Sequence, residues 1–542
     1  MNRRCWLYVF AVLCGSSASG QSLPPGFVDP YPVLAAARAA IGTDQLQCVS
    51  IAGSAYGGKV GQQRLHGYEV DWPRGEPLQN YRRVMNWQTG TMLEQFERTP
   101  GNNPASWKYG LGWKGGTPVQ QELQQAFMVN GAYAWHRDGE NAVPVAAAAA
   151  DAERWQLDLW INPHGFLKAA MLPGANPRAT WRWELGEMGR DGATVNPEKM
   201  TVVSIYVLGK FRVDATINSQ NLLQRIHTWV PDPVLGDTNY EHEFTNDSYL
   251  DIGDGIRFPS VWHSHTGWDD NYQAQSTNAG HNAFGGSLAE IQANVCPDPV
   301  AVPTAVIEAS AATQADTVVA TTAVADGVWL LGGGSHNSVA IEFANYVAVV
   351  EAPLNEARNL AVIEAIVQLV PDKPIRFLIN THQHHDHIGG LRTYMHIGAT
   401  IITHWKNYDF YTRDVLNYAQ RTLDPDMLSL WPPTELAEGY QYETVRENYV
   451  LTDNQRTLEI SYVHPLAHVE GMLIAYLPAE KILIEADLFD GPLVEAGPAV
   501  AGSPANNSLY SHVQRLGLDV ETIIPIHGHI TPWSEFVGLI TR

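Results

Sequence analysis

Polar and apolar residues alternate in the second half of the region that Cys48 and Cys296 bracket, as they do in strands with one buried face. The clearest case is residues 210–217 (KFRVDATI), in which the two kinds alternate throughout. The same region contains further predicted elements: strands at 222–230 and 256–263, a turn at Asp254-Gly255, and helices at 31–41 and 163–171. This pattern predicts an antiparallel, β-rich region with some helix.

The pattern changes after residue 296. Residues 297–303 contain three prolines, which interrupt regular structure. The Ala- and Thr-rich residues 309–322 suit either a linker or the first strand of a second domain. Beyond them strands and helix mix: strands are predicted at 327–331, 339–343, 346–350 and 375–380, and a helix at 355–368. We therefore predict a β-rich N-terminal domain over 21–300, a linker over 301–316 and a second domain over 317–542.

The length of the chain agrees with this division into domains, and its net charge limits the classes of binding partner. A chain of 542 residues is too long for a single core. Its 57 acidic and 34 basic residues give a formal net charge of −23, which would repel a polyanion. We predict a small-molecule substrate and no nucleic-acid partner, although the charge can also serve solubility alone. The oligomeric state is left open.

The first 20 residues have the pattern of a signal peptide. Arg3 and Arg4 precede an apolar run at residues 5–14, which is too short to span a bilayer, and small residues follow at 15–20. Leu13 stands before Cys14 where a lipidation signal needs a small residue, so we predict no lipid anchor. We expect export to the periplasm or the medium, without membrane insertion.

Export would leave Cys48 and Cys296 in an oxidising compartment, since Cys5 and Cys14 lie in the predicted signal peptide. Two cysteines alone cannot build a zinc site. They can form a disulfide or remain buried thiols, and the sequence favours neither.

The densest group of chemically active residues is His382-Gln383-His384-His385-Asp386-His387. It directly follows the predicted strand at 375–380, and the carboxyl ends of strands are where α/β folds place active sites. Imidazole and carboxylate are ligands that zinc favours in hydrolases. The alternative is a His-rich surface loop with incidental metal affinity, which the strand-to-turn context disfavours.

Three later residues complete a known order of motifs. The cluster is followed by His468, then by Asp487 at the end of an apolar run, then by His527 before Gly528. In this order, residues 317–542 resemble a metallo-β-lactamase-fold hydrolase. The resemblance implies an α+β protein whose C-terminal part is an αββα sandwich, two packed sheets with helices outside.

The resemblance also implies a site with two zinc ions. His382, His384 and His468 would bind one ion, Asp386, His387 and His527 the other, and Asp487 would bridge the two. The implied reaction is attack by a metal-bridging hydroxide, which Asp386 can orient. Ala467 and Val469 flank His468 where the family usually has Gly-His-Thr, a departure that can change the bonding around the imidazole.

Some nearby residues compete for these roles. We predict that neither His385 nor His529 is a ligand, that His464 and His404 are structural, and that Glu485 is a weaker rival of Asp487. His263 and His265 share a face of a predicted strand, but no further ligand is evident nearby. Aromatic residues between the cluster and His468 suit either a substrate pocket or, more simply, core packing: Trp405, Tyr408, Tyr411, Tyr418 and Trp431.

Branches of the resembled family differ at particular positions. No cysteine follows Cys296, which excludes branches with a Cys ligand, and His384 stands where the di-iron, oxygen-reducing branch has Glu. Asp487 favours the branches that cleave lactones, thioesters or related esters, since β-lactamases usually lack the bridging acid. A persulfide-oxidising mono-iron enzyme remains an alternative that only the metal content separates from a zinc hydrolase. Our hypothesis is an exported binuclear zinc hydrolase of an ester-like bond; the alternatives are a β-lactam hydrolase and a non-catalytic cell-envelope binding protein.

Overall fold

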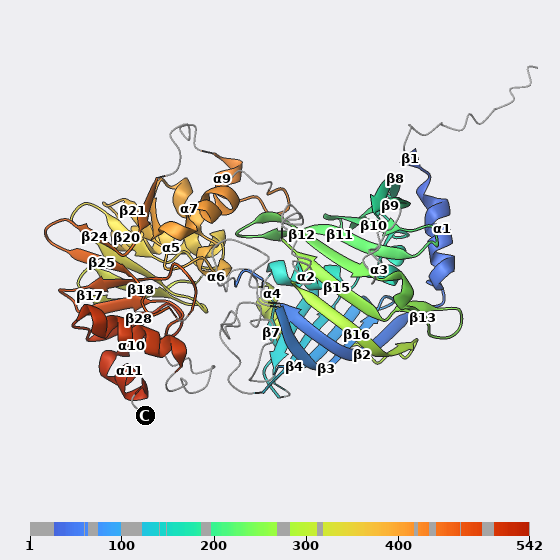
Figure 1. The fold of residues 1–542 in the computed structure, drawn as a ribbon, viewed down its shortest axis with the longest axis horizontal. Coiled ribbons are helices and arrows are strands. Elements are labelled where there is room, and N and C mark those ends of the chain that lie inside the picture. Colours follow the sequence, from blue (N-terminus) through green and yellow to red (C-terminus); the bar gives the residue numbers. More distant parts are fainter. Residues whose placement is uncertain are drawn as a thin grey trace, which may run out of the picture.

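The computed structural model describes residues 27–58, 60–62, 74–98, 122–139, 141–147, 149–185, 197–267, 282–311, 318–416, 421–432, 441–466, 468–489 and 503–540. The predicted signal peptide lies outside these residues. Figure 1 shows an N-terminal region dominated by one large sheet beside a C-terminal region of sheets and helices.

Within the described residues, the N-terminal region forms a 14-stranded sheet. In sheet order its strands are β1 (Phe27–Val28), β8 (Arg178–Leu185), β9 (Pro197–Val207), β10 (Phe211–Ile217), β11 (Leu223–Asp232), β12 (Gly236–Phe244), β15 (Val261–Thr266), β16 (Phe284–Ala293), β2 (Cys48–Gly58), β3 (Arg74–Asn86), β4 (Thr91–Arg98), β5 (Leu123–Asn130), β6 (Tyr133–Asp138) and β7 (Val145–Ala146). Neighbouring strands such as β10 and β11 pair antiparallel, which confirms the predicted β-rich, antiparallel region.

The main apolar cluster of this region lies on one face of the sheet, under helices α1 (Pro30–Ile41), α2 (Ala149–Asp158) and α3 (Pro163–Ala169). Strand β10 shows why: Phe211, Val213 and Ala215 alternate into the cluster while Arg212 is exposed. The predicted helices at 31–41 and 163–171 are confirmed as α1 and α3.

The prediction of one strand over 256–263 is wrong. Its first part is β14 (Arg257–Pro259), which pairs with β13 (Tyr249–Asp251) rather than with the large sheet. Pro259 ends it, since proline has no N–H to continue a ladder. The predicted turn is confirmed: Asp254 and Gly255 both have positive φ, as a tight hairpin turn requires.

Cys48 and Cys296 form a disulfide. Cys48 begins β2 and Cys296 follows β16, and these strands are neighbours in the sheet. Helix α4 (Thr304–Ala311) lies within the predicted linker over 301–316 and buries Val306 against Met128 and Trp135.

The described part of the C-terminal region contains a 7-stranded and a 6-stranded sheet. The first runs β17 (Ala320–Ala325), β18 (Val328–Gly332), β19 (Ser338–Glu342), β20 (Val347–Val350), β21 (Ile375–Ile379), β22 (Thr400–His404) and β23 (Tyr442–Val445). The second runs β24 (Asn448–Thr452), β25 (Thr457–Tyr462), β26 (Leu473–Leu477), β27 (Ile482–Glu485), β28 (Thr522–Pro525) and β29 (Thr531–Pro532). The helices are α5 (Glu356–Leu369), α6 (His385–Ile388), α7 (Leu391–His396), α8 (Tyr408–Phe410), α9 (Met427–Leu430), α10 (Pro504–Leu516) and α11 (Trp533–Ile540).

Apolar residues pack in three layers here, which confirms the predicted αββα sandwich. One layer joins the two sheets and contains Ile379 of β21 and Ile484 of β27. A second joins the first sheet to α5 and α7, and a third joins the other sheet to α10 and α11. The predicted strands and the helix at 355–368 are confirmed as β18 to β21 and α5, whose N-cap is Asn355.

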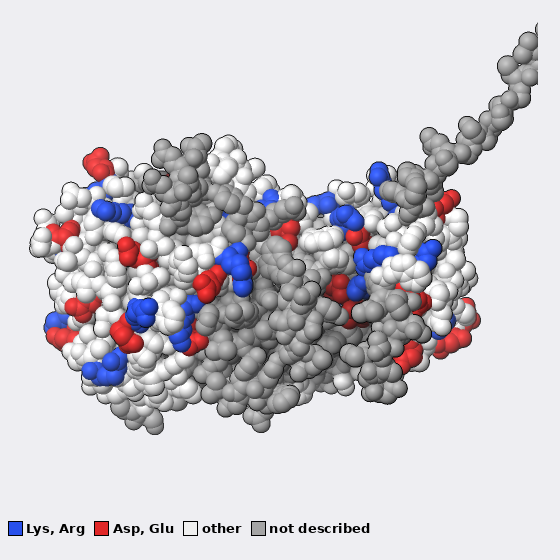
Figure 2. All heavy atoms as spheres, turned by 45° about the horizontal axis from the view of Figure 1, so that its top comes forward, with Lys and Arg blue, Asp and Glu red and all other residues white. Residues whose placement is uncertain are grey.

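No helix in the described residues is long and apolar enough to cross a membrane. On the face seen in Figure 2, acidic and basic side chains are interspersed, and neither sign gathers into one patch among the residues drawn in colour.

Candidate metal centre

The predicted site residues come together at one edge of the sandwich. The parallel strands β20 to β22 and β27 to β28 direct their carboxyl ends to this edge. His382 and His384 follow β21, Asp386 and His387 stand on α6, His468 lies between β25 and β26, Asp487 follows β27, and His527 follows β28. Among the described residues, the ligand atoms form two groups of four in this region.

The first group contains His382, His384, His468 and Asp487. His384 Nδ1 lies 3.1 Å from His382 Nε2 and 3.2 Å from His468 Nε2. Asp487 Oδ2 lies 3.0 Å from His468 Nε2 and 3.4 Å from His382 Nε2. Three imidazole nitrogens and one carboxylate oxygen thus point at a shared position.

The second group contains His387 and His527, and Asp487 reaches it with its other oxygen. Oδ1 of Asp487 lies 3.1 Å from His387 Nε2 and 3.0 Å from His527 Nε2. Asp386 Oδ2 lies 3.8 Å from His387 Nε2. Asp487 therefore stands between the groups with one oxygen toward each, the place predicted for a bridging carboxylate.

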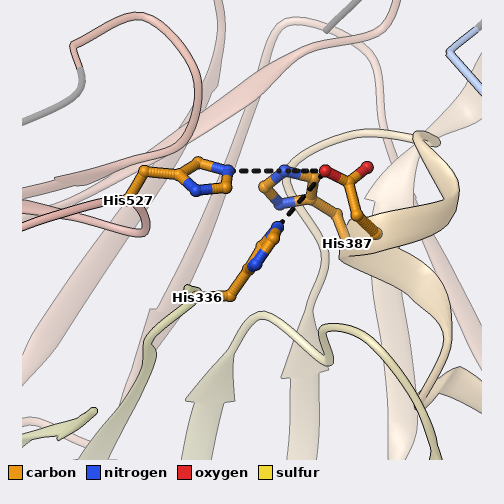
Figure 3. Close-up of side chains that lie close together, drawn as sticks. His336, His387 and His527 are labelled. Atoms are coloured by element: carbon orange, nitrogen blue, oxygen red, sulfur yellow. Dashed lines mark hydrogen bonds and ion pairs between the residues drawn. The ribbon is translucent and has the colours of Figure 1, made fainter. Parts of the chain in front are cut away.

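His336 is the member of the second group that the sequence interpretation missed. Its Nε2 lies 3.2 Å from Asp386 Oδ2, and Figure 3 shows His336, His387 and His527 turned toward one another. It follows a Gly-rich turn between β18 and β19. The next residue, Asn337, donates to the carbonyl oxygen of Gly528 at 2.9 Å, which ties this turn to the segment of His527. A histidine directly after a strand and a Gly-rich turn is the signal that could have found it.

Glu351 is a buried carboxylate directly behind His387. Its Oε2 accepts from His387 Nδ1 at 2.8 Å and its Oε1 from the backbone N–H of Thr381 at 2.6 Å. When the ring is neutral, its single proton lies on Nδ1, which donates to Glu351. His387 Nε2 is then unprotonated, and its lone pair faces the site. Glu351 has a φ of 74°, and Asp487 a φ of 58°. Such strained backbone in residues other than glycine gathers at functional sites.

Two other imidazoles are oriented in the same way. Thr381 Oγ1 lies 2.9 Å from His382 Nδ1, and His527 Nδ1 lies 3.2 Å from the carbonyl oxygen of Ser335. In both rings the Nδ1 atom is occupied and Nε2 is turned to the site. A partner on the far nitrogen is the usual environment of a metal-binding histidine.

The electrostatics of the site fit cations. Burial lowers the pKa of His384 to about 4 and that of His382 well below its usual range, so both rings are neutral and offer lone pairs. At His387 burial also lowers the pKa, but the charges of Asp487 and Asp386 outweigh it and raise the pKa well above its usual range. The carboxylates therefore favour a positive charge at His387, beside neutral imidazoles at His382 and His384.

Comparisons with known proteins concern the region that carries these residues. Residues 331–529 match the family model described as "Metallo-beta-lactamase superfamily". The C-terminal region is metallo-β-lactamase-like. No curated protein matches the sequence.

Solved structures similar to this region include a metallo-beta-lactamase from Pontibacter korlensis, with 14% identity, 41% of this chain and 98% of that chain covered, and a TM-score of 0.32. Another is the metallo-beta-lactamase FIM-1 from Pseudomonas aeruginosa in its mono-zinc form, with 19% identity, 42% and 95% coverage, and a TM-score of 0.30.

The predicted rivals in the metallo-β-lactamase-like region have other partners. Glu485 Oε2 accepts the backbone N–H groups of Leu488 at 3.1 Å and Phe489 at 3.2 Å, so it shapes the turn that carries Asp487. His464 Nε2 lies 3.3 Å from Glu447 and belongs to neither group of four. His404 Nε2 contacts the carbonyl oxygen of Arg446 at 3.2 Å. His385 and His529 also lie outside both groups.

The aromatic segment divides between packing and exposure. Tyr411 is buried and donates to the carbonyl oxygen of His382 at 3.2 Å. Trp405, Tyr408 and Trp431 are exposed, and Tyr418 lies outside the described residues. Tyr411 therefore supports the loop that carries His382.

A third group lies in the N-terminal sheet. His263 and His265 share a face of β15, as predicted, and Glu243 of the neighbouring β12 contacts both, at 2.7 and 3.4 Å. Their ligand atoms lie within 4.8 Å of one another. The sequence interpretation missed Glu243 because strand pairing, not sequence distance, brings it to His263. These three residues offer fewer candidate ligands than either group of four.

Proposed function

We propose that this protein is an exported binuclear zinc hydrolase that cleaves an ester-like bond, such as a lactone or thioester, in a small molecule. One observation carries the proposal: Asp487 directs one oxygen to each of two groups of buried imidazoles. The superfamily match of residues 331–529 supports hydrolysis as the reaction class.

The residues divide by the position that they would hold. His382, His384 and His468 would bind one ion and His387, His527 and Asp386 the other, with Asp487 between them and His336 beside Asp386. Zinc in such a site lowers the pKa of a bound water from about 15.7 toward neutrality and polarises the scissile carbonyl.

We assign the role of catalytic carboxylate to Asp386. Its side chain is 33% exposed, more than those of its neighbours in the site, so it can meet both substrate and water. We assign Asp386 to orient the attacking water and to accept its proton. Glu351 holds His387 in a fixed orientation while this happens.

Two further features support the finer parts of the proposal. The position of Asp487 favours ester-like substrates over β-lactams. The Cys48–Cys296 disulfide supports export, because disulfides persist in oxidising compartments. Mass spectrometry of the mature N-terminus tests export, and retention of residues 1–20 would contradict it.

Metal analysis and a substrate panel test the reaction. We expect about two zinc ions per chain, as in two-metal hydrolases, and turnover of lactones or thioesters above phosphodiesters, sulfate esters and β-lactams. A preference for β-lactams would replace the ester-like substrate. A single iron would contradict the zinc hydrolase, and absence of both metal and turnover would favour a binding protein.

A further inference from the structure

Residues 60–62 of the N-terminal region lie directly against α6. The backbone N–H of His385 donates to the carbonyl oxygen of Gly61 at 3.1 Å, and Val60 packs on the apolar layer beneath α5 and α7. Gly61 has a φ of +77°, and a Cβ there would lie 2.4 Å from His385 Cγ. Only glycine permits this approach. The fourth imidazole of the cluster therefore faces the N-terminal region and not the metal centre.

Gln62 extends this contact to a predicted metal ligand. Its Nε2 donates to Asp386 Oδ1 at 2.8 Å, while Asp386 Oδ2 lies 3.2 Å from His336 Nε2. The two oxygens of Asp386 are thus held from opposite sides, one by each region. Asp386 is the most exposed of the side chains in its group, so it has the least packing to fix its rotamer.

The turn between β11 and β12 anchors the two regions to each other. Val234 and Leu235 are fully buried in the apolar layer of α5 and α7. Arg421 donates to the carbonyl oxygen of Val234 at 2.7 Å, and the backbone N–H of Thr422 donates to Asp237 Oδ2 at 2.9 Å. Buried apolar side chains and hydrogen bonds to a charged group fix the position of the N-terminal region against the site.

We propose that Gln62 is a positioning residue of the metal centre. By donating to Asp386 Oδ1, it orients the carboxylate so that Oδ2 faces His387 and His336. The N-terminal region is then part of the active site and not a separate binding module. The effect on turnover rests on the whole proposed function, whereas the effect on metal binding rests only on its two-zinc site and not on the reaction.

Zinc titration of the full chain against a competing chelator tests this role, with Gln62→Ala and Gln62→Glu as variants. Loss of a hydrogen-bond partner behind a metal ligand typically weakens metal affinity about 10–100-fold. We expect a loss of this size at the second zinc in Gln62→Ala and an unchanged first zinc. Gln62→Glu should lose at least as much, because a second carboxylate beside Asp386 repels it. On an ester substrate, kcat should fall more than KM changes.

Two controls separate positioning from general weakening of the interface. Thr422→Val removes a hydrogen bond to Asp237 in the same interface without touching a ligand, and it should bind both zinc ions as the wild type does. Gly61→Ala should weaken the second zinc, whereas Gly90→Ala, at a φ of +67° with nothing within 4 Å, should not.

The outcomes are distinct. Wild-type affinity for the second zinc in Gln62→Ala would overturn the inference, and so would an equal loss in Thr422→Val. If no ester is cleaved but Gln62→Ala selectively loses the second zinc, the proposed reaction fails and the role of Gln62 stands.

Discussion

The two regions of this protein bury apolar residues in different ways. The N-terminal sheet gathers its main cluster on one face, under short helices. The C-terminal sandwich has three apolar layers, so both faces of each sheet are covered. Antiparallel neighbours in the first region place successive strand ends at opposite edges, whereas the parallel strands of the second bring several ends to one edge.

This difference explains where the chemistry lies. The candidate ligands that follow β21, β27 and β28 converge because the ends of those strands converge. The N-terminal sheet has no comparable convergence among its described residues, and its group of Glu243, His263 and His265 arises from strand pairing alone. Among the described residues, the sandwich therefore supplies the candidate ligands, and Gln62, which follows β2 of the N-terminal region, donates a hydrogen bond to one of them.

The largest expected effect comes from removing the ligands. His384→Ala and Asp487→Ala should lose zinc and reduce turnover by more than the roughly 10–100-fold that an outer partner costs. The N-terminal sheet should stay folded, because the described residues of its main apolar cluster include neither side chain. Zinc per chain, turnover and tryptophan fluorescence check this. His263→Ala is the control and should keep two zinc ions; wild-type turnover in either ligand variant would contradict the assignment.

The disulfide gives the next test and acts on the other region. Replacing Cys48 and Cys296 with alanine removes a link between residues that are 248 positions apart in the chain. Removal of a native disulfide typically lowers the free energy of unfolding by about 2–5 kcal/mol. We expect the urea-unfolding transition of the sheet to move to lower urea while zinc content stays the same. Loss of zinc before the sheet unfolds would show that the regions depend on each other more closely.

Substitution of one carboxylate in each region, Glu351 and Glu94, compares the two regions directly. Glu351→Gln leaves one acceptor oxygen for three donors, Thr381, Asn380 and His387, and should weaken zinc binding about 10–100-fold. Glu94→Gln in the sheet weakens a contact to Arg83 and Tyr81 and should lower only the stability of the sheet. Zinc affinity and urea unfolding of both variants check this. An effect of Glu94→Gln on zinc affinity would contradict the separation.

The sequence singled out most of the residues that lie together in the candidate site. Residues 382–387, Asp487 and His527 stand out locally, because they are closely spaced imidazoles or lie directly after an apolar strand. His336 has only a weak local signal, its place after a strand and a Gly-rich turn, and Gln62, a neutral amide 324 residues from Asp386, has none. Their roles depend on packing between distant segments.

The same limit applies to the fold. Periodicity located β10, β18 to β21 and α5, because each buries a regular face. It could not give the neighbour pairs β1–β8 and β16–β2, which join strands far apart in sequence. Strand 256–263 was misplaced for a related reason, since the break at Pro259 depends on which partner each half finds.

The smallest expected effect concerns acid, and it compares one histidine in each region. Burial lowers the pKa of His164 in the sheet and of His512 in the sandwich, each to about 4. The unfolded chain binds a proton on each ring below its ordinary pKa of about 6.5, which the folded region excludes. The free energy of unfolding therefore falls as pH drops from about 6.5 toward 4 and is unaffected by these rings above that window, with a slope of at most about 1.4 kcal/mol per pH unit for each ring. His164→Gln should flatten the slope for the sheet and His512→Gln that for the sandwich. Urea unfolding across this pH range checks both, and a slope unchanged in its own region would mean that the ring there is protonated in the folded state.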